Sequence, residues 1–469
     1  MTSTLDWDAI GRDAAATLSR YVQFDTTNPP GAEMAAAAWL ADQVRARGIT
    51  DDVTVHEPAP GRGLVLARIP GSEPLRPLLL NHHVDVVGAE PAAWTHPPFS
   101  GAIADGYVWG RGTLDTKNLG VIFLLALESL VRAGACFRRP VVFLAVPDEE
   151  TGGTHGMRWL VERYADELDP EWVWDEGGGG FKDMFGPGIL FGLTVAEKQI
   201  QHLKLIATGK PGHASMPHSD NANVTLMAAL DRVLARPRPM RVNAITAAMF
   251  RTIAPTQGFP ASVLLSRLDR PLALRLAARR LASSPSLNAM LRDTISLTVL
   301  RAGYKVNVIP ERAEAEIDCR LLPDTDAEEF HGWLRGRLAE TPHRGVSTEG
   351  RVAETPHRGV STEGRVTVEV MESSPPSGSA PLTGAFVDAV HEGVETHHPG
   401  ASVFPMVVPG GTDGRYWRRR GTPAYGFAPV LMEPGDLDRV HGIDERIRVD
   451  DLLTAVKIAR DVIERLCVA

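Results

Sequence analysis

Histidines and carboxylates, the side chains that most often bind metal ions, stand where apolar stretches of this sequence end. His83 and Asp85 are separated by one residue and follow the apolar run that begins at Leu78. Side chains two apart on an extended segment project to the same side, so the Asp85 carboxylate could hold one ring nitrogen of His83. A histidine held in this way is typical of a metal ligand. This pair alone is a common sequence pattern, so further ligands are needed before it indicates a metal site.

Three carboxylates further along the chain are candidates for those further ligands. Asp115 follows a glycine-rich turn and opens a predicted helix, a position that by itself is more typical of a helix N-cap. Glu149 and Glu150 belong to a run of three adjacent acids, which is either a solvated loop or a site where a cation takes up the charge. In the second interpretation one carboxylate binds metal and its neighbour is a general base toward water.

Glu176 and His441 complete the set. Glu176 precedes four glycines, which let the backbone approach a ligand closely, and His441 stands in the segment HGIDER near the C-terminus. Imidazole nitrogens combined with carboxylate oxygens favour Zn²⁺ over Mg²⁺ or Ca²⁺, which prefer shells made only of oxygen. Co²⁺ and Mn²⁺ also suit such a donor set, so the sequence predicts a metal site without choosing among the three.

Alternating strands and helices must position these residues. We predict strands at 78–87, 140–146 and 171–174, and helices at 115–133 and 155–164. This alternation is typical of an α/β sheet with both faces covered. Ligands of such sheets bind beyond the carboxyl ends of the strands, where the candidate residues stand.

The pattern changes after residue 197. Residues 199–208 alternate between apolar and polar, as a strand with one exposed face does, and a predicted helix at 224–235 follows. Further strands are expected within 306–322 and at 368–371, which together suggest a small α+β domain. The predicted organisation is a catalytic domain in two pieces, 1–197 and 373–469, with a lid domain inserted at 198–372.

Two segments of the predicted lid lack an assigned role. Residues 236–301 are rich in Arg, Leu, Pro and Ala, and either cover a pocket or decorate the surface. Residues 339–352 are repeated identically at 353–366, which indicates a recent duplication or an error in the sequence. One tandem copy is not a solenoid, and its polar content predicts a surface loop within 339–366.

Length and composition limit the number of domains and the classes of partner that this chain is expected to have. A chain of 469 residues is expected to hold two domains, and 43% hydrophobic with 23% charged residues is ordinary for a globular protein. The net charge of −9 argues against partners such as nucleic acid or an anionic membrane. Three distant cysteines and the absence of a signal-peptide pattern at the start predict a cytoplasmic protein.

At these motifs the sequence resembles the co-catalytic zinc metallopeptidase family that contains aminoacylase, carboxypeptidase S, glutamate carboxypeptidase and succinyl-diaminopimelate desuccinylase. The resemblance runs from about Asp25 to the C-terminus. It implies an α/β zinc-peptidase domain, with a mixed sheet covered on both faces, and an inserted α+β lid domain of the dimerisation type. The matching segments, in the family's order, are NHHVDVV, GRGTLDTKN, VPDEETGGTHG, WDEGGGG, TGKPGHASMP, KVNVIPERAEAEIDCRLLP, PGGTDGRYWRRRGTPAYGFAP and HGIDER.

The resemblance also implies a role for each candidate residue. Two Zn²⁺ ions, or Co²⁺ or Mn²⁺, would share one bridging carboxylate. The implied metal ligands are Asp115 as the bridge, His83 and Glu176 at one ion, and Glu150 and His441 at the other. Asp85 would orient His83, and Glu149 would be the general base. His213 in the lid would stabilise the oxyanion, Asn307, Arg320 and Arg415 would hold a substrate carboxylate, and Thr412 and Gly411 would line that pocket.

The implied activity is hydrolysis of an amide bond next to a free carboxylate, as in a carboxypeptidase or an N-acyl-amino-acid amidohydrolase. The substrate would be a small acylated amino acid or a short peptide, and the lid would provide a homodimer interface. Three alternatives stay open: desuccinylase-like or dipeptidase activity, an enzyme with a single metal ion, and a non-catalytic binding protein on the same fold. Gly414 replaces the family's commoner Asn in TDGRY, beside the implied carboxylate pocket.

Overall fold

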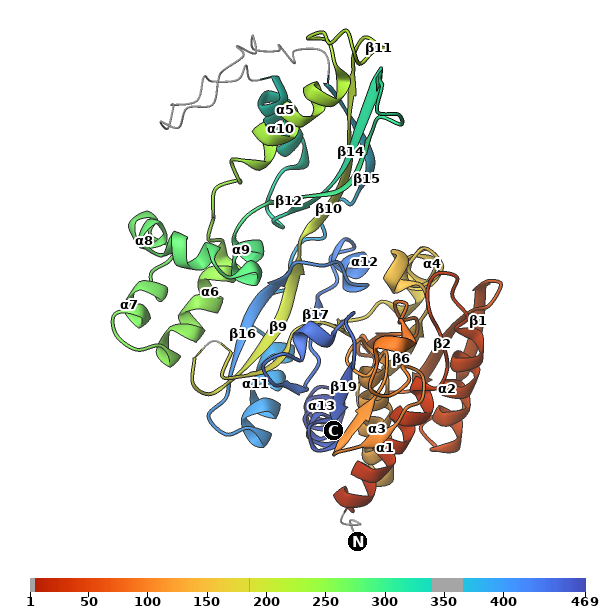
Figure 1. The fold of residues 1–469 in the computed structure, drawn as a ribbon. Helices are drawn as coiled ribbons and strands as arrows, with labels where there is room; N and C mark the ends of the chain where they lie inside the picture. The colour runs from red at the N-terminus through yellow and green to blue at the C-terminus, as the bar shows by residue number, and fades with distance from the viewer. Residues whose placement is uncertain (1–4, 185, 340–365) are drawn as a thin grey trace. The chain divides into compact units, whose positions relative to one another are not determined.

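The computed structural model describes residues 5–184, 186–339 and 366–469, and they form two compact units (Figure 1). The first unit contains Met1–Glu197, Val242–Ala277 and Ser377–Ala469, and the second contains Lys198–Arg241 and Ala278–Pro376. We expected all of 198–372 in the lid, but residues 242–277 belong to the first unit. There Ile245 joins the main hydrophobic core. Apart from its two end residues, the duplicated segment 339–366 lies outside the described residues.

The described part of the first unit is built on a ten-stranded mixed sheet. The strand order is β1-β2-β6-β3-β7-β17-β9-β8-β18, with β16 beside β9 (Figure 1). The central strand β3 runs parallel to both β6 and β7, so the three carboxyl ends share one edge. The strands are β1 (Val53–Ala59), β2 (Arg62–Ile69), β3 (Leu78–His83), β6 (Val141–Val146), β7 (Trp172–Asp175), β8 (Gly179–Lys182), β9 (Ile189–Glu197), β16 (Ser402–Val408), β17 (Ala424–Gly426) and β18 (Leu431–Met432).

Both faces of this sheet are buried, which explains why β6 is apolar at every position and why β3 begins with three leucines. On β6, Phe143 contributes to one core cluster while its neighbours Val142 and Leu144 contribute to another on the opposite face. The predicted doubly covered α/β sheet is therefore confirmed. The helices of this unit are α1 (Trp7–Val22), α2 (Met34–Ala46), α3 (Lys117–Arg132), α4 (Met157–Leu168), α6 (Ala244–Ile253), α7 (Ala261–Leu265), α11 (Ala385–His397), α12 (Gly414–Arg418) and α13 (Val449–Cys467).

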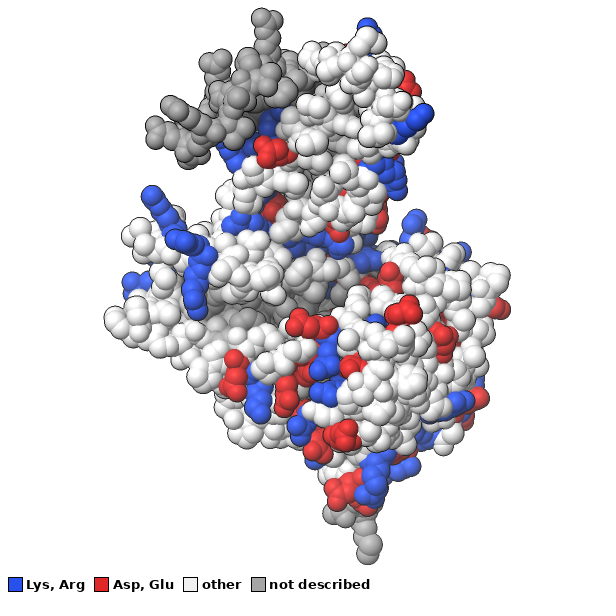
Figure 2. Space-filling model, viewed as in Figure 1, with Lys and Arg blue, Asp and Glu red and all other residues white. Residues whose placement is uncertain are grey.

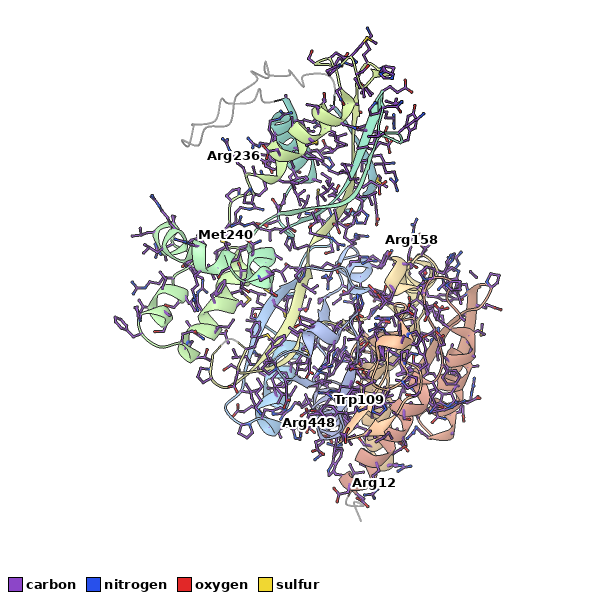
Figure 3. All side chains as sticks on the ribbon, viewed as in Figure 1. Arg12, Trp109, Arg158, Arg236, Met240 and Arg448 are labelled. Atoms are coloured by element: carbon purple, nitrogen blue, oxygen red, sulfur yellow. The ribbon has the colours of Figure 1, made fainter. Side chains whose placement is uncertain are left out.

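A small three-stranded sheet joins distant parts of the first unit. Strand β5 (Tyr107–Trp109) pairs antiparallel with β4 (Ile103–Ala104) and with β19 (Arg446–Arg448). Trp109 and Arg448, labelled in Figure 3, lie on the two neighbouring strands β5 and β19. This pairing brings the loop that carries Asp115 next to the segment that carries His441.

The second unit is an antiparallel four-stranded sheet with helices, as the predicted α+β lid requires. The order is β12-β14-β10-β15, and alternate residues such as Leu203, Leu205 and Ile317 form a core with α5 and α10. Its elements are β10 (Gln199–Thr208), β11 (Gly212–His213), β12 (Thr294–Ala302), β13 (Val308–Ile309), β14 (Arg312–Leu321), β15 (Val366–Ser373), α5 (Ala222–Leu234), α9 (Pro285–Leu291) and α10 (Ala327–Ala339).

Helix α8 (Pro271–Ala282) spans the boundary between the two units. Short 3₁₀ turns complete the described elements: η1 (Pro91–Ala93), η2 (Glu149–Thr151), η3 (Ala254–Thr256) and η4 (Leu437–Arg439). Within the described ranges, no helix has both the length and the apolar character needed to cross a bilayer.

Candidate metal centre

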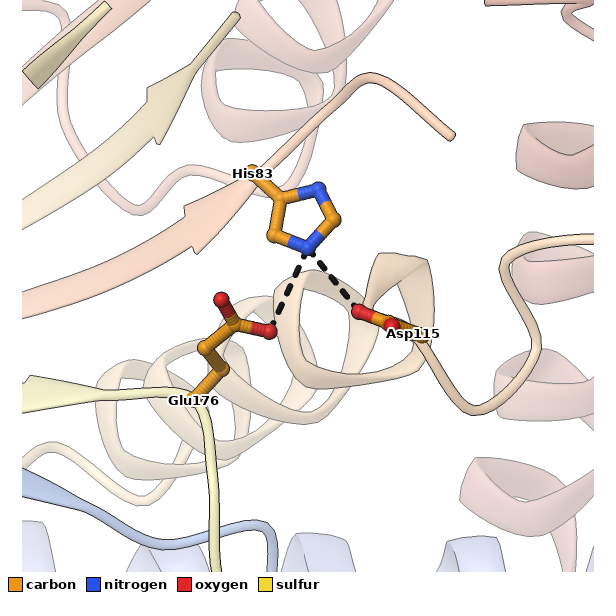
Figure 4. Close-up of side chains that lie close together, drawn as sticks. All are labelled: His83, Asp115 and Glu176. Atoms are coloured by element: carbon orange, nitrogen blue, oxygen red, sulfur yellow. Dashed lines mark hydrogen bonds and ion pairs between the residues drawn. The ribbon is translucent and has the colours of Figure 1, made fainter. Parts of the chain in front are cut away.

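Three predicted ligands meet at the carboxyl edge of the main sheet (Figure 4). His83 is the last residue of β3, and Glu176 directly follows β7, the parallel neighbour of β3. The Nε2 atom of His83 lies 3.0 Å from Oδ1 of Asp115 and 3.2 Å from Oε2 of Glu176. Asp115 stands in the loop just before α3, whose buried length fixes that loop against the sheet.

The second group uses the other oxygen of the same aspartate. Oδ2 of Asp115 lies 3.0 Å from Nε2 of His441, which in turn lies 3.3 Å from Oε2 of Glu150. His441 has a positive φ of 58°, and Glu150 is the second residue of the 3₁₀ turn η2 after β6. The Asp115 carboxylate therefore faces two separate groups of ligands, one through each oxygen.

Both groups fit small divalent cations. Within each group, one ligand atom per residue lies within 4.8 Å of the others. Ligand atoms about 2.1 Å from a tetrahedral ion are about 3.4 Å apart, close to the separations described above. Oε1 of Glu150 is also buried without a hydrogen-bond partner. The donor types, their spacing and this unsatisfied oxygen all suit a cation at each group.

The pKa shifts within the cluster also indicate that its charges suit a bound cation. Burial raises the pKa of Glu176 to about 8 against the positive charge of His83, and the nearby carboxylate of Asp115 adds to the rise. Hydrogen bonds to Asp115 and Glu150 raise the pKa of His441 to about 10. Burial opposes the charge of His83, yet Glu176 and Asp115 hold its pKa well above the usual value. The positive charge of the protonated histidines therefore balances the negative charge of the carboxylates. A bound divalent cation would balance the same negative charge.

Asp85 supports the site through contacts other than the expected one. We expected its carboxylate to orient His83, but Oδ1 is 3.6 Å from Nδ1, whereas the backbone carbonyl of Asp85 accepts a hydrogen bond from Nδ1 at 2.8 Å. The carboxylate instead accepts the backbone N–H groups of Glu149 and Glu150, both at 3.1 Å. It also accepts the side-chain amide of Asn28 at 2.8 Å. Asp85 therefore fixes the backbone that carries the predicted base and one ligand.

The predicted base, Glu149, occupies the first position of the turn η2. Burial raises its pKa well above the usual value, and the negative charges of Glu176 and Asp413 raise it further. The positive charges of His83 and Arg415 act in the opposite direction. A carboxylate in this setting holds a proton more readily than one in water, as a general base must.

Glu445 is a buried residue of the site that the sequence analysis did not single out. Its side chain is 0% exposed, and Oε1 accepts the backbone N–H groups of Gly112, Leu114 and Asp115 at 3.1, 2.7 and 3.1 Å. Oε2 forms a 2.7 Å ion pair with Arg111. Glu445 lies four residues after His441, so it joins the two loops that carry the bridging aspartate and a ligand. Its presence in the HGIDER segment was the signal available beforehand.

Asn28 is a second buried residue that the sequence analysis did not single out. Its side-chain amide donates to Asp85 at 2.8 Å and to Oδ1 of Asp148 at 3.2 Å. Asn28 is 3% exposed, and its carbonyl oxygen accepts a hydrogen bond from Arg62 at 3.0 Å. This network ties the N-terminal turn to the backbone beneath the site.

Three predicted substrate-binding residues lie in the first unit. Arg415, on α12, is 8% exposed, and burial opposes its charge while Glu149 and Glu197 raise its pKa. The backbone N–H of Thr412 donates to Glu197 at 2.6 Å. Gly411 immediately precedes Thr412. The structure therefore brings Arg415 close to the predicted base, with Thr412 and Gly411 in the preceding loop.

The other three lie in the second unit. His213 on β11 pairs with β13, and the backbone carbonyl of Asn307 accepts the N–H of Ala214 at 3.1 Å, so these two residues are neighbours. The Arg320 guanidinium forms a two-pronged contact with Asp318 at 2.8 and 3.1 Å. We expected the Arg320 guanidinium to bind a substrate carboxylate, but in this structure it binds the carboxylate of Asp318.

Known proteins resemble this chain over most of its length. The model of peptidase family M20/M25/M40 matches residues 79–465. The N-fatty-acyl-amino acid synthase/hydrolase PM20D1 of Xenopus tropicalis is 32% identical over 390 residues, covering 81% of this chain and 71% of that protein. Aminoacylase-1 of Sus scrofa is 28% identical over 460 residues, covering 97% of this chain and 96% of that protein.

Solved structures show the same fold. The M20 family metallo-carboxypeptidase Sso-CP2 from Sulfolobus solfataricus has a TM-score of 0.67 and 17% sequence identity, covering 96% of this chain and 98% of that chain. Human carnosine dipeptidase 1 has a TM-score of 0.66 and 14% identity, covering 98% and 97%.

Proposed function

This chain belongs to peptidase family M20/M25/M40 and is a metal-dependent hydrolase of amide bonds, and we propose that it acts with two metal ions on an N-acylated amino acid. The observation that carries the proposal is the Asp115 carboxylate, whose two oxygens face two histidines at 3.0 Å each. An aspartate shared in this way suits a bridge between two cations. We propose Zn²⁺ for both, with Co²⁺ or Mn²⁺ as substitutes that the same donors would accept.

The proposed ligands divide into two sets around the bridge. His83 and Glu176 would hold one ion and Glu150 and His441 the other, each together with Asp115. A pair of bound cations supplies Lewis acidity, which activates water and polarises the scissile carbonyl. Because Nδ1 of His83 donates to the carbonyl of Asp85, Nε2 is the nitrogen that would bind an ion.

Glu149 would move the proton. Its backbone is held by the Asp85 carboxylate, and the adjacent Glu150 is a proposed ligand, so the base would stand beside a water activated at that site. Its raised pKa suits a group that takes a proton from water and returns it to the leaving amine.

Recognition of a free carboxylate is assigned to Arg415. Its guanidinium is nearly buried and lies close enough to Glu149 for their charges to interact. An arginine fork binds a carboxylate through two parallel hydrogen bonds. Thr412 and Gly411 would line this pocket. Asn307 and Arg320 stay predictions of the family resemblance, and Arg320 would have to leave Asp318 to bind a substrate carboxylate. His213 would donate to the oxyanion, a contact worth roughly 3–4 kcal/mol in comparable enzymes.

We favour an apolar acyl group over a second amino acid. The support comes from two relatives, an N-fatty-acyl-amino acid synthase/hydrolase and an aminoacylase. Dipeptidase or desuccinylase-like activity is the alternative, since a carnosine dipeptidase shares the fold.

The test is a turnover screen that compares N-acyl amino acids with dipeptides, and each with the matching amide that lacks a carboxylate. We expect the N-acyl amino acids to be the best substrates and the carboxylate-free amides to be poor. Faster turnover of dipeptides would replace the proposed substrate class. Equal turnover of acids and amides would remove the assigned role of Arg415, which the variant Arg415→Lys tests directly because lysine keeps the charge but loses the fork.

Two further expectations belong with this function. We propose a homodimer through the second unit, supported by a stripe of exposed apolar side chains on α5, Val224, Met227 and Leu234. We also propose a cytoplasmic location, supported by three cysteines that are all free. Light scattering of the purified chain tests the dimer.

A further inference from the structure

A strongly basic segment lies within a chain whose net charge is −9. Residues 251–280 contain six arginines and one aspartate, a net charge of +5. The single acid, Asp269, faces Arg251 at 3.9 Å. Among the described residues, no carboxylate forms an ion pair with Arg267, Arg270, Arg275, Arg279 or Arg280. The positive charge of this segment is therefore left uncompensated.

Large apolar side chains share the same segment and face solvent. Phe259 is 87% exposed, Leu272 70%, Leu276 68% and Val263 46%. Phe259 immediately precedes α7, and the two leucines lie on α8. Isolated exposed leucines are ordinary, but four large exposed apolar side chains within residues 259–276 are an unusual concentration of apolar surface in contact with water.

Helix α8 is oriented with its larger apolar residues outward. Its buried side carries Ala273, Ala277 and Leu281. Leu272 and Leu276 lie one turn apart on the exposed side, and Arg275 and Arg279, also one turn apart, lie beside them. The outward face thus alternates leucine with arginine. Figure 2 shows basic side chains projecting from the surface in the region where Figure 1 places α7 and α8.

We propose that the outward face of α7 and α8 docks on an anionic lipid surface. Arginines attract the charged headgroups while leucine and phenylalanine enter the boundary between headgroups and acyl chains, as interfacial amphipathic helices do. The uncompensated positive charge favours a membrane over a second copy of the chain as the partner of this face. A second copy that presented the same face would be repelled by like charge, whereas an anionic membrane has the complementary charge. This proposal is independent of the substrate assigned above.

The test is co-sedimentation of the purified full chain with vesicles of phosphatidylcholine alone and of phosphatidylcholine mixed with phosphatidylserine. We expect binding to the mixed vesicles, little binding to the neutral ones, and release as salt is raised. The variant Leu272→Gln/Leu276→Gln removes the apolar part, and Arg275→Gln/Arg279→Gln removes two charges. Each is expected to weaken binding to the mixed vesicles by about tenfold or more.

Matched controls remove similar side chains elsewhere in the first unit. Ile103, which is 54% exposed, is replaced by Gln, and the exposed Arg12 is replaced by Gln. Both controls are expected to bind like the parent, and unchanged turnover of a soluble substrate shows that every variant is folded. Absence of binding to mixed vesicles overturns the proposal. Binding of the α8 variants that equals that of the parent also overturns the proposal. A dimer that the α8 variants dissociate overturns it as well, since the face would then join two copies of the chain.

Discussion

At the scale of single residues, the centre depends on carboxylates that each make more than one contact. Asp115 divides its oxygens between His83 and His441, and Asp85 holds the backbone of Glu149 and Glu150 while its carbonyl orients His83. Such shared contacts make the positions of ligand and base interdependent. A change at one residue should therefore affect either metal affinity or proton transfer, and the two effects can be measured separately.

Replacement of Glu149 by Gln should remove the base while leaving the metal ligands intact. We expect kcat to fall by about 10²–10⁴-fold because proton transfer from water loses its acceptor. Metal content, measured by elemental analysis, should stay equal to that of the parent. Glu162→Gln, at an exposed ion pair on α4, is the control and should keep full activity. Full activity of Glu149→Gln would contradict the mechanism.

Replacement of Glu445 by Ala should loosen the loop that carries Asp115. The change leaves Arg111 buried without its partner and three backbone N–H groups without an acceptor. We expect a loss of about 3–5 kcal/mol in the free energy of unfolding, and metal affinity weaker by about 10–100-fold. Urea denaturation and metal titration measure the two effects.

The control for Glu445 is Glu433→Gln, which removes an exposed ion pair with Arg448. It should change neither quantity. Wild-type metal affinity in Glu445→Ala would show that this residue does not position the bridging aspartate.

At the scale of elements, the site follows from the parallel pairing of β3 with β6 and β7. Their carboxyl ends share an edge, so residues more than 60 positions apart, such as His83 and Glu149, reach one place. The three-stranded sheet β4-β5-β19 adds the C-terminal ligand to the same edge. The apolar sequence of β6 is a consequence of the burial of both faces of the sheet.

The contact between the edge strand β1 and α4 predicts a pH dependence of stability. His56 on β1 packs against the rings of Trp159 and Tyr164 with centroids 5.4 and 5.2 Å away. Burial lowers the pKa of His56, and the charge of Arg68 lowers it further. The unfolded chain therefore takes up a proton at higher pH than the folded chain does, so stability falls as pH drops below the unfolded pKa of about 6.5.

We expect His56→Gln to reduce this loss. Urea midpoints of the metal-free chain at about pH 8 and about pH 5 should differ less in the variant than in the parent. An equal or larger difference in the variant would show that protonation of His56 does not contribute.

At the scale of the whole molecule, net charge is a poor guide to where charge lies. The total of −9 led us to expect no membrane partner, yet residues 251–280 carry +5 on an exposed surface. The proposed lipid docking replaces that expectation. The same segment illustrates how domain boundaries can depart from sequence order, since 242–277 packs with the first unit although it interrupts the second.

Metal removal tests the molecule as a whole. A chelator should abolish activity and lower the melting temperature, because cations that bind only the folded chain stabilise it by mass action. Adding Zn²⁺ back should restore both, with two ions per chain at saturation. One ion per chain would favour the single-metal alternative, and a metal-free chain with full activity would contradict metal dependence.

The sequence by itself determined the family, the fold class and the order of the chemical motifs. The predicted metal ligands are histidines and carboxylates, which the sequence shows directly, and the strands and glycine-rich turns around them are local patterns that can be recognised without coordinates. Only the tertiary structure showed that Glu445 is a buried clamp, that Asp85 holds a backbone, and that Leu272 and Leu276 face solvent. Local periodicity cannot reveal these features. The sequence does not distinguish a buried acid from a surface acid, because the contact that buries this one joins residues some 330 positions apart. Nor does it show whether leucine or alanine faces inward, because both are apolar and tertiary packing determines the orientation of the helix.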